Sequence, residues 1–244
     1  MNAKSKGSGD SLPSTKPAVL AITGASGAIY GVRLLEQLLE HDVPVHLTIS
    51  DSGAAVIAQE LGLQLDLANP DIAALMHAGR KFLFRDPRQD AIQSDGDAIK
   101  KLCNEIATKG MLTVHHYKNY FTPIASGSFL TSGMIVCPCS GSTLSGIAHA
   151  ASQNLIQRAA DVHLKEHRKL IVVPRETPLS LIQLESMKRI TEAGGIVLPA
   201  SPGWYHGVTN VLDLVDFVVA RILDQLGVES TLMKRWAVGS ISVN

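Results

Sequence analysis

Continuous apolar runs, each followed by a segment of helical periodicity, are the feature that most restricts how this chain can fold. Runs of Val, Ile and Leu without polar alternation are typical of strands that are buried on both faces of a parallel sheet. Such runs occupy residues 18–24, 43–50, 133–139, 169–174 and 194–199. Helical spacing follows them at residues 28–40, 52–62, 143–168, 180–193 and 211–227, with a break expected near residues 152–154. This alternation predicts an α/β fold, a doubly wound parallel sheet in a single domain.

The two ends of the chain and residues 63–119 lack this rhythm. Residues 1–17 are rich in Ser, Gly, Lys and Pro and carry no apolar stretch, so we expect a disordered tail rather than a secretory signal or a transit peptide. We place the folded domain at residues 18–236 and a C-terminal tail at residues 237–244. Residues 63–119 contain a helix-like segment near residues 98–109 and no clear parallel-strand pattern, so we interpret them as a variable, insertion-like segment.

The charge balance and the cysteine count exclude several kinds of partner. Lys plus Arg and Asp plus Glu both number 22, so no basic excess indicates nucleic acid. No window approaches 18 consecutive apolar residues, so we expect no membrane span. The odd count of three cysteines favours a reducing cytoplasm. Cys137 and Cys139 are too close for common zinc spacing and have no second pair, so we expect no metal site.

Four unusual stretches lie at the expected carboxyl ends of the strands, where ligands bind in open α/β sheets. They are TGASGAIYG (23–31), CPCSGSTLSG (137–146), VVPRETP (172–178) and SPGWYHG (201–207). In the first, helix amides and the Ser26 hydroxyl favour an anion such as phosphate, and an ordinary tight turn is the alternative. In the second, the hydroxyl side chains either cap the helix or hold a ligand.

Charged side chains gather at the same edge and on two of the helices. Arg175 and Glu176 stand between two prolines, and charges fixed on a stiff loop indicate a site. Arg158 and Lys165 share one helical face, for which a solvated surface is the simpler interpretation. Arg221 interrupts an apolar helix. It either faces inward, where it needs an anionic partner, or lies at the surface with its stem covering apolar neighbours.

Other polar and aromatic residues have a structural interpretation. Asp213 and Asp216 form a D-x-x-D pair that helix packing explains better than magnesium binding. The histidines, His46 and His115 among them, show no ligand spacing and are treated as ordinary. The aromatic side chains of Trp204 and Tyr205 either stack on a planar ligand or close the core.

Taken together, these motifs resemble the UbiX family of flavin prenyltransferases. The resemblance rests on ITGASGAIYGVRLLEQL, MIVCPCSGSTLSGIAHA, NLIQRAADVHLKEHRKLIVVPRETPLS and LPASPGWYH followed by DLVDFVVARILDQLG. It runs in order from Ala18 to Ser50 and from Ala125 to Trp236. GWYHGVTNV departs from the more usual GFYHRPQSV. The implied fold is a Rossmann or flavodoxin-like flavoprotein.

The resemblance implies an enzyme that joins a dimethylallyl group to N5 and C6 of reduced FMN. The implied donor is dimethylallyl phosphate, and the product, prenylated FMN, is the cofactor of UbiD-type decarboxylases. It also implies a homo-oligomer, with a dodecamer as the expected assembly, and sites between subunits. No metal, nucleic acid or membrane partner is implied.

The resemblance also assigns residues to tasks. It places FMN contacts at Gly24, Ala25, Ser26, Ser50, Ser140, Gly141, Ser142, Thr143 and Arg158. It places the donor phosphate at Ser126, Gly127, Lys165, Arg175, Tyr205 and Arg221. Catalytic roles fall to Glu176, Glu60, Lys165 and Ser26.

Two other functions stand beside this one. A flavin-dependent decarboxylase would act directly on a small acid and would need a catalytic His or Cys at the site. A non-catalytic FMN carrier would pass flavin to a partner and would not need Glu176 or the phosphate-binding cations. The sequence contains both Glu176 and these cations, so it does not favour the carrier.

Overall fold

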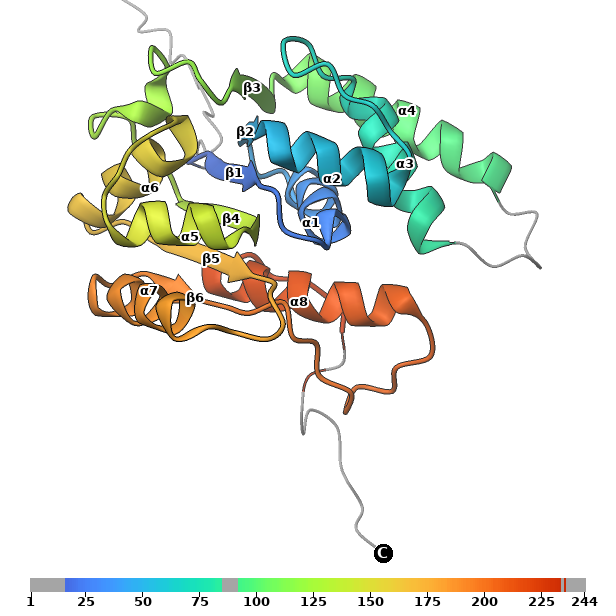
Figure 1. The fold of residues 1–244 in the computed structure, drawn as a ribbon. Coiled ribbons are helices and arrows are strands. Elements are labelled where there is room, and N and C mark those ends of the chain that lie inside the picture. Colours follow the sequence, from blue (N-terminus) through green and yellow to red (C-terminus); the bar gives the residue numbers. More distant parts are fainter. Residues whose placement is uncertain (1–15, 85–91, 234, 236–244) are drawn as a thin grey trace, which may run out of the picture.

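The computed structural model describes residues 16–84, 92–233 and 235. The expected tails at 1–17 and 237–244 therefore lie outside the described residues, apart from residues 16 and 17. At the centre is a sheet of six strands in the order β3-β2-β1-β4-β5-β6, and every neighbouring pair is parallel (Figure 1). Its strands are β1 Ala18–Ile22, β2 Val45–Ile49, β3 Leu112–His116, β4 Gly133–Cys139, β5 Leu170–Pro174 and β6 Ile196–Val197. The predicted doubly wound sheet is confirmed, and its strand order is that of the Rossmann fold, with the reversal between β1 and β4.

Helices cover both faces of the sheet. They are α1 Ala28–Glu40, α2 Asp51–Leu61, α3 Ile72–Leu83, α4 Ile92–Lys109, α5 Gly141–Ala148, α6 Leu155–Lys165, α7 Leu181–Glu192 and α8 Val211–Leu226, with a 3₁₀ turn at Pro123–Ala125. Leu20 and Ile22 of β1 point into the core formed with α1, α3 and α8, while Val19 and Ala21 point into the core formed with α5 and α6. Burial on both faces explains why this strand has no polar alternation.

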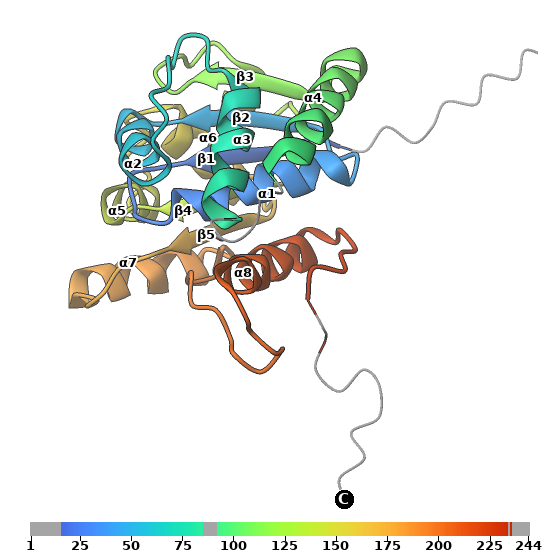
Figure 2. The same ribbon diagram turned by 90° about the vertical axis from the view of Figure 1, so that its right-hand side faces the viewer.

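The helix α1 is held between two others on one face of the sheet. It lies between α3 and α8 and contacts both (Figure 2). Gly31 lets α1 approach the end of β4 closely, because a Cβ there would lie 2.3 Å from the carbonyl oxygen of Cys137. The first turn of α1 is thus held directly beside the carboxyl edge of the sheet.

Residues 63–119 contain more structure than the sequence indicated. The strand β3 was missed, and it pairs in parallel with β2 over its whole length. Because β3 is an edge strand with partly exposed side chains, its sequence LTVHH alternates instead of forming an apolar run. The helix α3 was also missed, and its Gly79 packs against Val32 of α1.

Several local predictions are confirmed. Gly62 ends α2 in the left-handed conformation, with φ 71°. The expected break near residues 152–154 separates α5 from α6, and Asn154 caps α6 by accepting a hydrogen bond from the backbone of Gln157. Among the described helices, none is long and apolar enough to cross a bilayer.

Candidate functional site

The carboxyl ends of the parallel strands meet at one edge, as expected. The turn after β1, Ser50 after β2, the segment from Ser140 after β4 and the loop from Arg175 after β5 all follow strand ends there (Figure 1). Thr23 joins two of these turns, because its hydroxyl donates to the Pro138 carbonyl at 2.8 Å and accepts from the Ser140 amide at 2.9 Å. The edge is therefore one connected surface.

Glu60 caps the first helix. Its carboxylate accepts hydrogen bonds from the Gly27 amide, 3.0 Å from each oxygen, and from the Ala28 amide at 2.9 Å. A helix N-terminus favours an anion, and Glu60, in the last turn of α2, is close enough to supply one. The sequence pattern predicts a phosphate on these amides. In the structure both amides have an anionic partner from the chain itself, the Glu60 carboxylate.

Glu60 also lines a pocket of about 450 Å³ between α1, α3 and α8. Its polar wall is formed by Ser26, Glu60 and Arg175, and the Arg175 Nε donates to the Ser26 carbonyl at 3.2 Å. Its apolar wall is formed by Ile29, Tyr30, Phe82, Ala200, Pro202, Val211, Leu214 and Val215. Burial raises the pKa of Tyr30, so this phenol is neutral near pH 7. The pocket suits a small molecule with one polar and one apolar end.

The hydroxyl-rich turns are helix caps. Ser50 accepts from the Gly53 amide at 3.0 Å, and Ser140 accepts from the Thr143 amide at 3.3 Å. Ser140 also lies 3.2 Å from the hydroxyl of Ser142. The capping interpretation is confirmed. A hydroxyl that accepts from an amide can still donate its proton, so capping leaves these groups able to bind a ligand.

The PRETP loop holds its glutamate at the surface. Glu176 accepts from the side-chain amide of Gln183 at 3.3 Å and from the Thr177 amide at 3.2 Å. Gln183 belongs to the capping box of α7, with Ser180 as the N-cap. The first turn of α7 therefore orients the Glu176 carboxylate, which stays exposed to solvent.

A second group of predicted residues gathers on α6. The Arg158 Nε donates to the Ala125 carbonyl at 3.2 Å, and its guanidinium pairs with Asp161 at 3.0 Å. Arg168, which sequence reasoning missed, donates to the carbonyls of Gly127 and Phe129. The two arginines thus hold the segment that carries Ser126 and Gly127 against α6. Lys165, at the end of the same helix, contacts Glu166 at 3.3 Å.

A third group lies on α8 and on the loop before it. Tyr205 packs edge-on against Phe217, with ring centroids 5.7 Å apart. Arg221 pairs with Asp224 at 2.9 Å, and its side chain is 46% exposed. The inward-facing interpretation of Arg221 is therefore wrong, because the buried side of α8 carries Val218 and Ile222 instead. In the described part of the chain, Lys165, Tyr205 and Arg221 do not line the pocket that contains Arg175.

The structural interpretation of the D-x-x-D pair is confirmed. Asp213 accepts from the Asn210 amide at 3.1 Å and completes a capping box at the start of α8. Asp216 pairs with Arg33 of α1 at 2.8 Å.

Two polar contacts at the β2–β3 side were missed by sequence reasoning. Tyr117 donates a short hydrogen bond to Asp51 at the start of α2, and this bond lowers the pKa of the carboxyl. His46 and His115 lie on neighbouring strands with Nδ1 and Nε2 2.8 Å apart. Burial lowers the pKa of both imidazoles, that of His115 to about 4. Both contacts depend on β3, which carries His115 and places Tyr117 directly after its end. Because the sequence pattern did not reveal β3, neither contact could be predicted.

An α/β sheet of Rossmann order with hydroxyl-rich turns along its carboxyl edge is the architecture of a class of flavin-binding proteins. The family model described as Flavoprotein matches residues 8–223 of this chain.

Individual relatives narrow the class. The Flavin prenyltransferase UbiX of Alkalihalophilus pseudofirmus is 42% identical over 221 residues, which cover 91% of this chain and 96% of the relative. A solved structure of AnUbiX (PadA1), in complex with FMN and dimethylallyl pyrophosphate, has a TM-score of 0.69 and 31% identity and covers 93% of this chain and 100% of that one. A dodecameric FMN-dependent UbiX-like decarboxylase from Escherichia coli O157:H7 has a TM-score of 0.68 and 35% identity, with 90% and 98% covered. The chain belongs to the family of UbiX flavin prenyltransferases and is a transferase.

Proposed function

We propose that this chain joins the dimethylallyl group of dimethylallyl phosphate to N5 and C6 of reduced FMN and releases prenylated FMN. One observation carries the proposal. Arg175 and Glu176 follow β5 directly, and Arg175 contacts the Ser26 turn at 3.2 Å. A cation for a leaving phosphate and a carboxylate for a departing proton thus stand side by side at the edge where ligands bind in this fold.

The residues present fit a flavin. Its phosphate would meet serine and threonine hydroxyls at the N-termini of α2 and α5, where Ser50, Ser140 and Thr143 lie. The residues that would hold it are Gly24, Ala25, Ser26, Ser50, Ser140, Gly141, Ser142, Thr143 and Arg158. When bound, the reduced flavin supplies the two nucleophilic ring atoms.

The donor phosphate would bind Ser126, Gly127, Lys165, Arg175, Tyr205 and Arg221. Lys165, Arg175 and Arg221 offer three positive charges to a leaving group whose charge is about −2, and arginine adds directional hydrogen bonds. This match is why the proposal includes a metal-free reaction, since magnesium is recruited mainly for diphosphates, whose charge is higher. Activity that is lost in EDTA and restored by magnesium would contradict this part of the proposal.

Within one chain these phosphate ligands fall into three groups: Ser126, Gly127 and Lys165 near α6, Arg175 after β5, and Tyr205 and Arg221 on α8 and the loop before it. We therefore propose a homo-oligomer, up to a dodecamer, in which neighbouring copies complete each site. Exposed apolar side chains support such contacts, since Phe121 is fully exposed and Leu181 and Ile182 are each 73% exposed.

Two carboxylates would serve the site, one at the reacting atoms and one that holds the first turn of α1. Closing the second bond requires the C6 proton to leave, and Glu176, which is exposed and oriented by Gln183, would accept it. Glu60 would hold Ser26 and the first turn of α1 in place through its two amide contacts.

The product would pass to a UbiD-type decarboxylase, and we propose the cytoplasm as the compartment.

Replacing Glu176 tests the proton step. The Glu176→Gln variant should bind FMN like the wild type in a flavin fluorescence titration and should close the ring at C6 at least a hundredfold more slowly. Glu185→Gln, an exposed glutamate on α7, is the matched control and should leave the rate unchanged. Ring closure at the wild-type rate by Glu176→Gln would show that another group takes the proton.

A further inference from the structure

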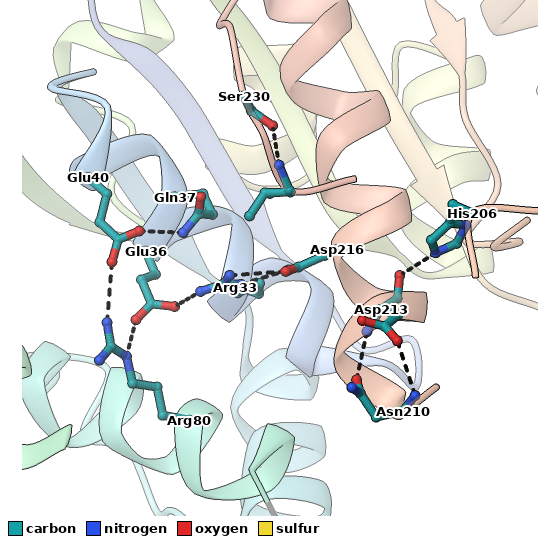
Figure 3. Close-up of polar contacts among 11 residues, drawn as sticks. Arg33, Glu36, Gln37, Glu40, Arg80, His206, Asn210, Asp213, Asp216 and Ser230 are labelled. Atoms are coloured by element: carbon teal, nitrogen blue, oxygen red, sulfur yellow. Dashed lines mark hydrogen bonds and ion pairs between the residues drawn. The ribbon is translucent and has the colours of Figure 1, made fainter. Parts of the chain in front are cut away.

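A buried network of ion pairs joins α1 to both of its neighbours on one face of the sheet. Arg33 of α1 binds Asp216 of α8 through two hydrogen bonds, Nε–Oδ1 at 2.8 Å and Nη2–Oδ2 at 3.1 Å (Figure 3). Its third nitrogen pairs with Glu36 at 2.6 Å. Arg80 of α3 pairs with the other oxygen of Glu36 and with Glu40 at 3.2 Å. Nothing in the proposed reaction uses these groups.

The Arg33–Asp216 pair is charged and largely hidden from water. The side chains of Arg33 and Asp216 are 12% and 9% exposed, and that of Glu36 is 3% exposed. Burial opposes the charge of Arg33, but Asp216 and Glu36 outweigh it and raise the pKa of the guanidinium. Arg33 is therefore charged at every working pH.

The helix that Asp216 belongs to carries one of the proposed donor ligands, and the loop before this helix carries another. Arg221 lies on α8 itself. The loop with Tyr205 is fastened to α8, because the ring of His206 stacks on Phe217 at 5.2 Å. The Nε2 of His206 also contacts the Asp213 carbonyl at 3.1 Å (Figure 3). The loop and α8 therefore form one unit, which we call the α8 unit (residues 201–226).

Apolar packing and a bidentate ion pair hold such a unit in different ways. Val215, Val218 and Ile222 bury α8 against the core, but contacts between aliphatic side chains tolerate small slides and rotations. A carboxylate held by two parallel N–H donors fixes both distance and direction. A buried pair of this kind adds little stability over apolar side chains of the same size, so its contribution is mainly geometric.

The geometry points to Arg33 and Asp216 as a positioning pair for the donor phosphate. By fixing α8 against α1, the pair sets where its own chain holds Tyr205 and Arg221, and with them the part of a donor site that this chain would contribute to the assembly. This inference rests on the proposed function, because the donor is dimethylallyl phosphate. It assigns no contact with the reacting atoms to either residue.

The test replaces the pair with apolar side chains of similar size, Arg33→Met with Asp216→Leu. Glu36 keeps Arg80 as its partner in this variant, so no buried charge loses its counterion. Affinity for dimethylallyl phosphate, measured by calorimetry on the FMN-loaded protein, should fall about tenfold, and the KM of the donor should rise by a similar factor. Affinity for FMN should stay within twofold of wild type.

Arg80→Met is the matched control. It removes the other arginine that pairs with Glu36. Arg80 joins α3 to α1 through Glu36 and Glu40, and these ion pairs do not involve α8. Its donor affinity should stay within twofold of wild type. Hydrogen exchange gives a readout without ligand. The double variant should exchange faster in residues 201–226, and Arg80→Met should do so in residues 72–83.

Each outcome decides the matter. Unchanged donor affinity in the folded double variant would overturn the inference, whether or not residues 201–226 exchange faster, and so would an equal loss of donor affinity in Arg80→Met. If the double variant does not fold, Asp216→Asn replaces it and should weaken donor binding at least threefold, while unchanged binding would again overturn the inference. A wild-type protein that binds no dimethylallyl phosphate would refute the proposed function instead, and hydrogen exchange alone would then decide whether the pair fixes α8.

Discussion

Removing the Glu60 side chain tests the capping of the first helix most sharply. In Glu60→Ala the amides of Gly27 and Ala28 lose the carboxylate that accepts from both, at 2.9–3.0 Å. Each hydrogen bond of this kind contributes roughly 1 kcal/mol net, and the charge at a helix N-terminus contributes about 0.3–1 kcal/mol more. Gly27 lines the pocket, so water can reach its freed amide and no larger desolvation penalty is added for it. We expect the free energy of unfolding to fall by about 2 kcal/mol.

The assay is urea unfolding followed by far-UV circular dichroism at pH 7, with all variants at one protein concentration because assembly adds to stability. The urea dependence of the free energy should not change, since the same surface is exposed on unfolding. Gln59→Ala is the control. It alters an exposed neighbour on α2 and should change stability by less than about 0.5 kcal/mol.

The freed amides also predict a gain in anion binding. Inorganic phosphate should stabilise Glu60→Ala more than the wild type, by about 1 kcal/mol at five times its dissociation constant. A variant as stable as the wild type would refute the role of Glu60 as a cap. Equal stabilisation of both proteins by phosphate would refute the idea that Glu60 occupies an anion site.

Three further predictions concern other parts of the molecule. Gly31→Ala should destabilise the fold by more than about 3 kcal/mol in the same assay, because its Cβ would meet the Cys137 carbonyl at 2.3 Å; a mild effect would mean that α1 can move away from β4. The depressed pKa values of His46 and His115 mean that the unfolded chain binds more protons between pH ~6.5 and 4, so stability falls as the pH drops through this window. The fall from pH 7 to pH 5 should be smaller by about 1 kcal/mol in His115→Asn, after a discount for partial exposure, and an unchanged pH profile would contradict the buried pair. Arg221→Ala should raise the KM of the donor while FMN affinity stays constant, and loss of FMN binding would contradict its assignment to the donor phosphate.

Local and periodic features of the fold could be predicted from the sequence. The central strands are buried on both faces, so they appear as apolar runs, and helix stops such as Gly62 need only local geometry. The strand β3 lies at the edge of the sheet and is half-exposed, so its pattern is weak. The orientation of Arg221 was equally hidden, because an apolar helix does not reveal which of its sides meets the core.

Contacts between distant segments could not be predicted. Glu60 lies 33 residues from Gly27, and Arg33 lies 183 residues from Asp216. Only the packing of α2 and α8 beside α1 brings these charges together, and no spacing rule in a single sequence encodes it. The site residues themselves were named through resemblance, and the structure adds which of them share a surface within one chain.

The central claim is the prenylation of flavin, and one measurement tests it most directly. The protein is incubated without oxygen with reduced FMN, dimethylallyl phosphate and excess EDTA, and the flavin is then released and weighed by mass spectrometry. We predict a flavin heavier by one five-carbon unit, absent when either the protein or the donor is left out. Unmodified FMN after prolonged incubation, from a protein that demonstrably binds both FMN and the donor, would contradict the proposed reaction.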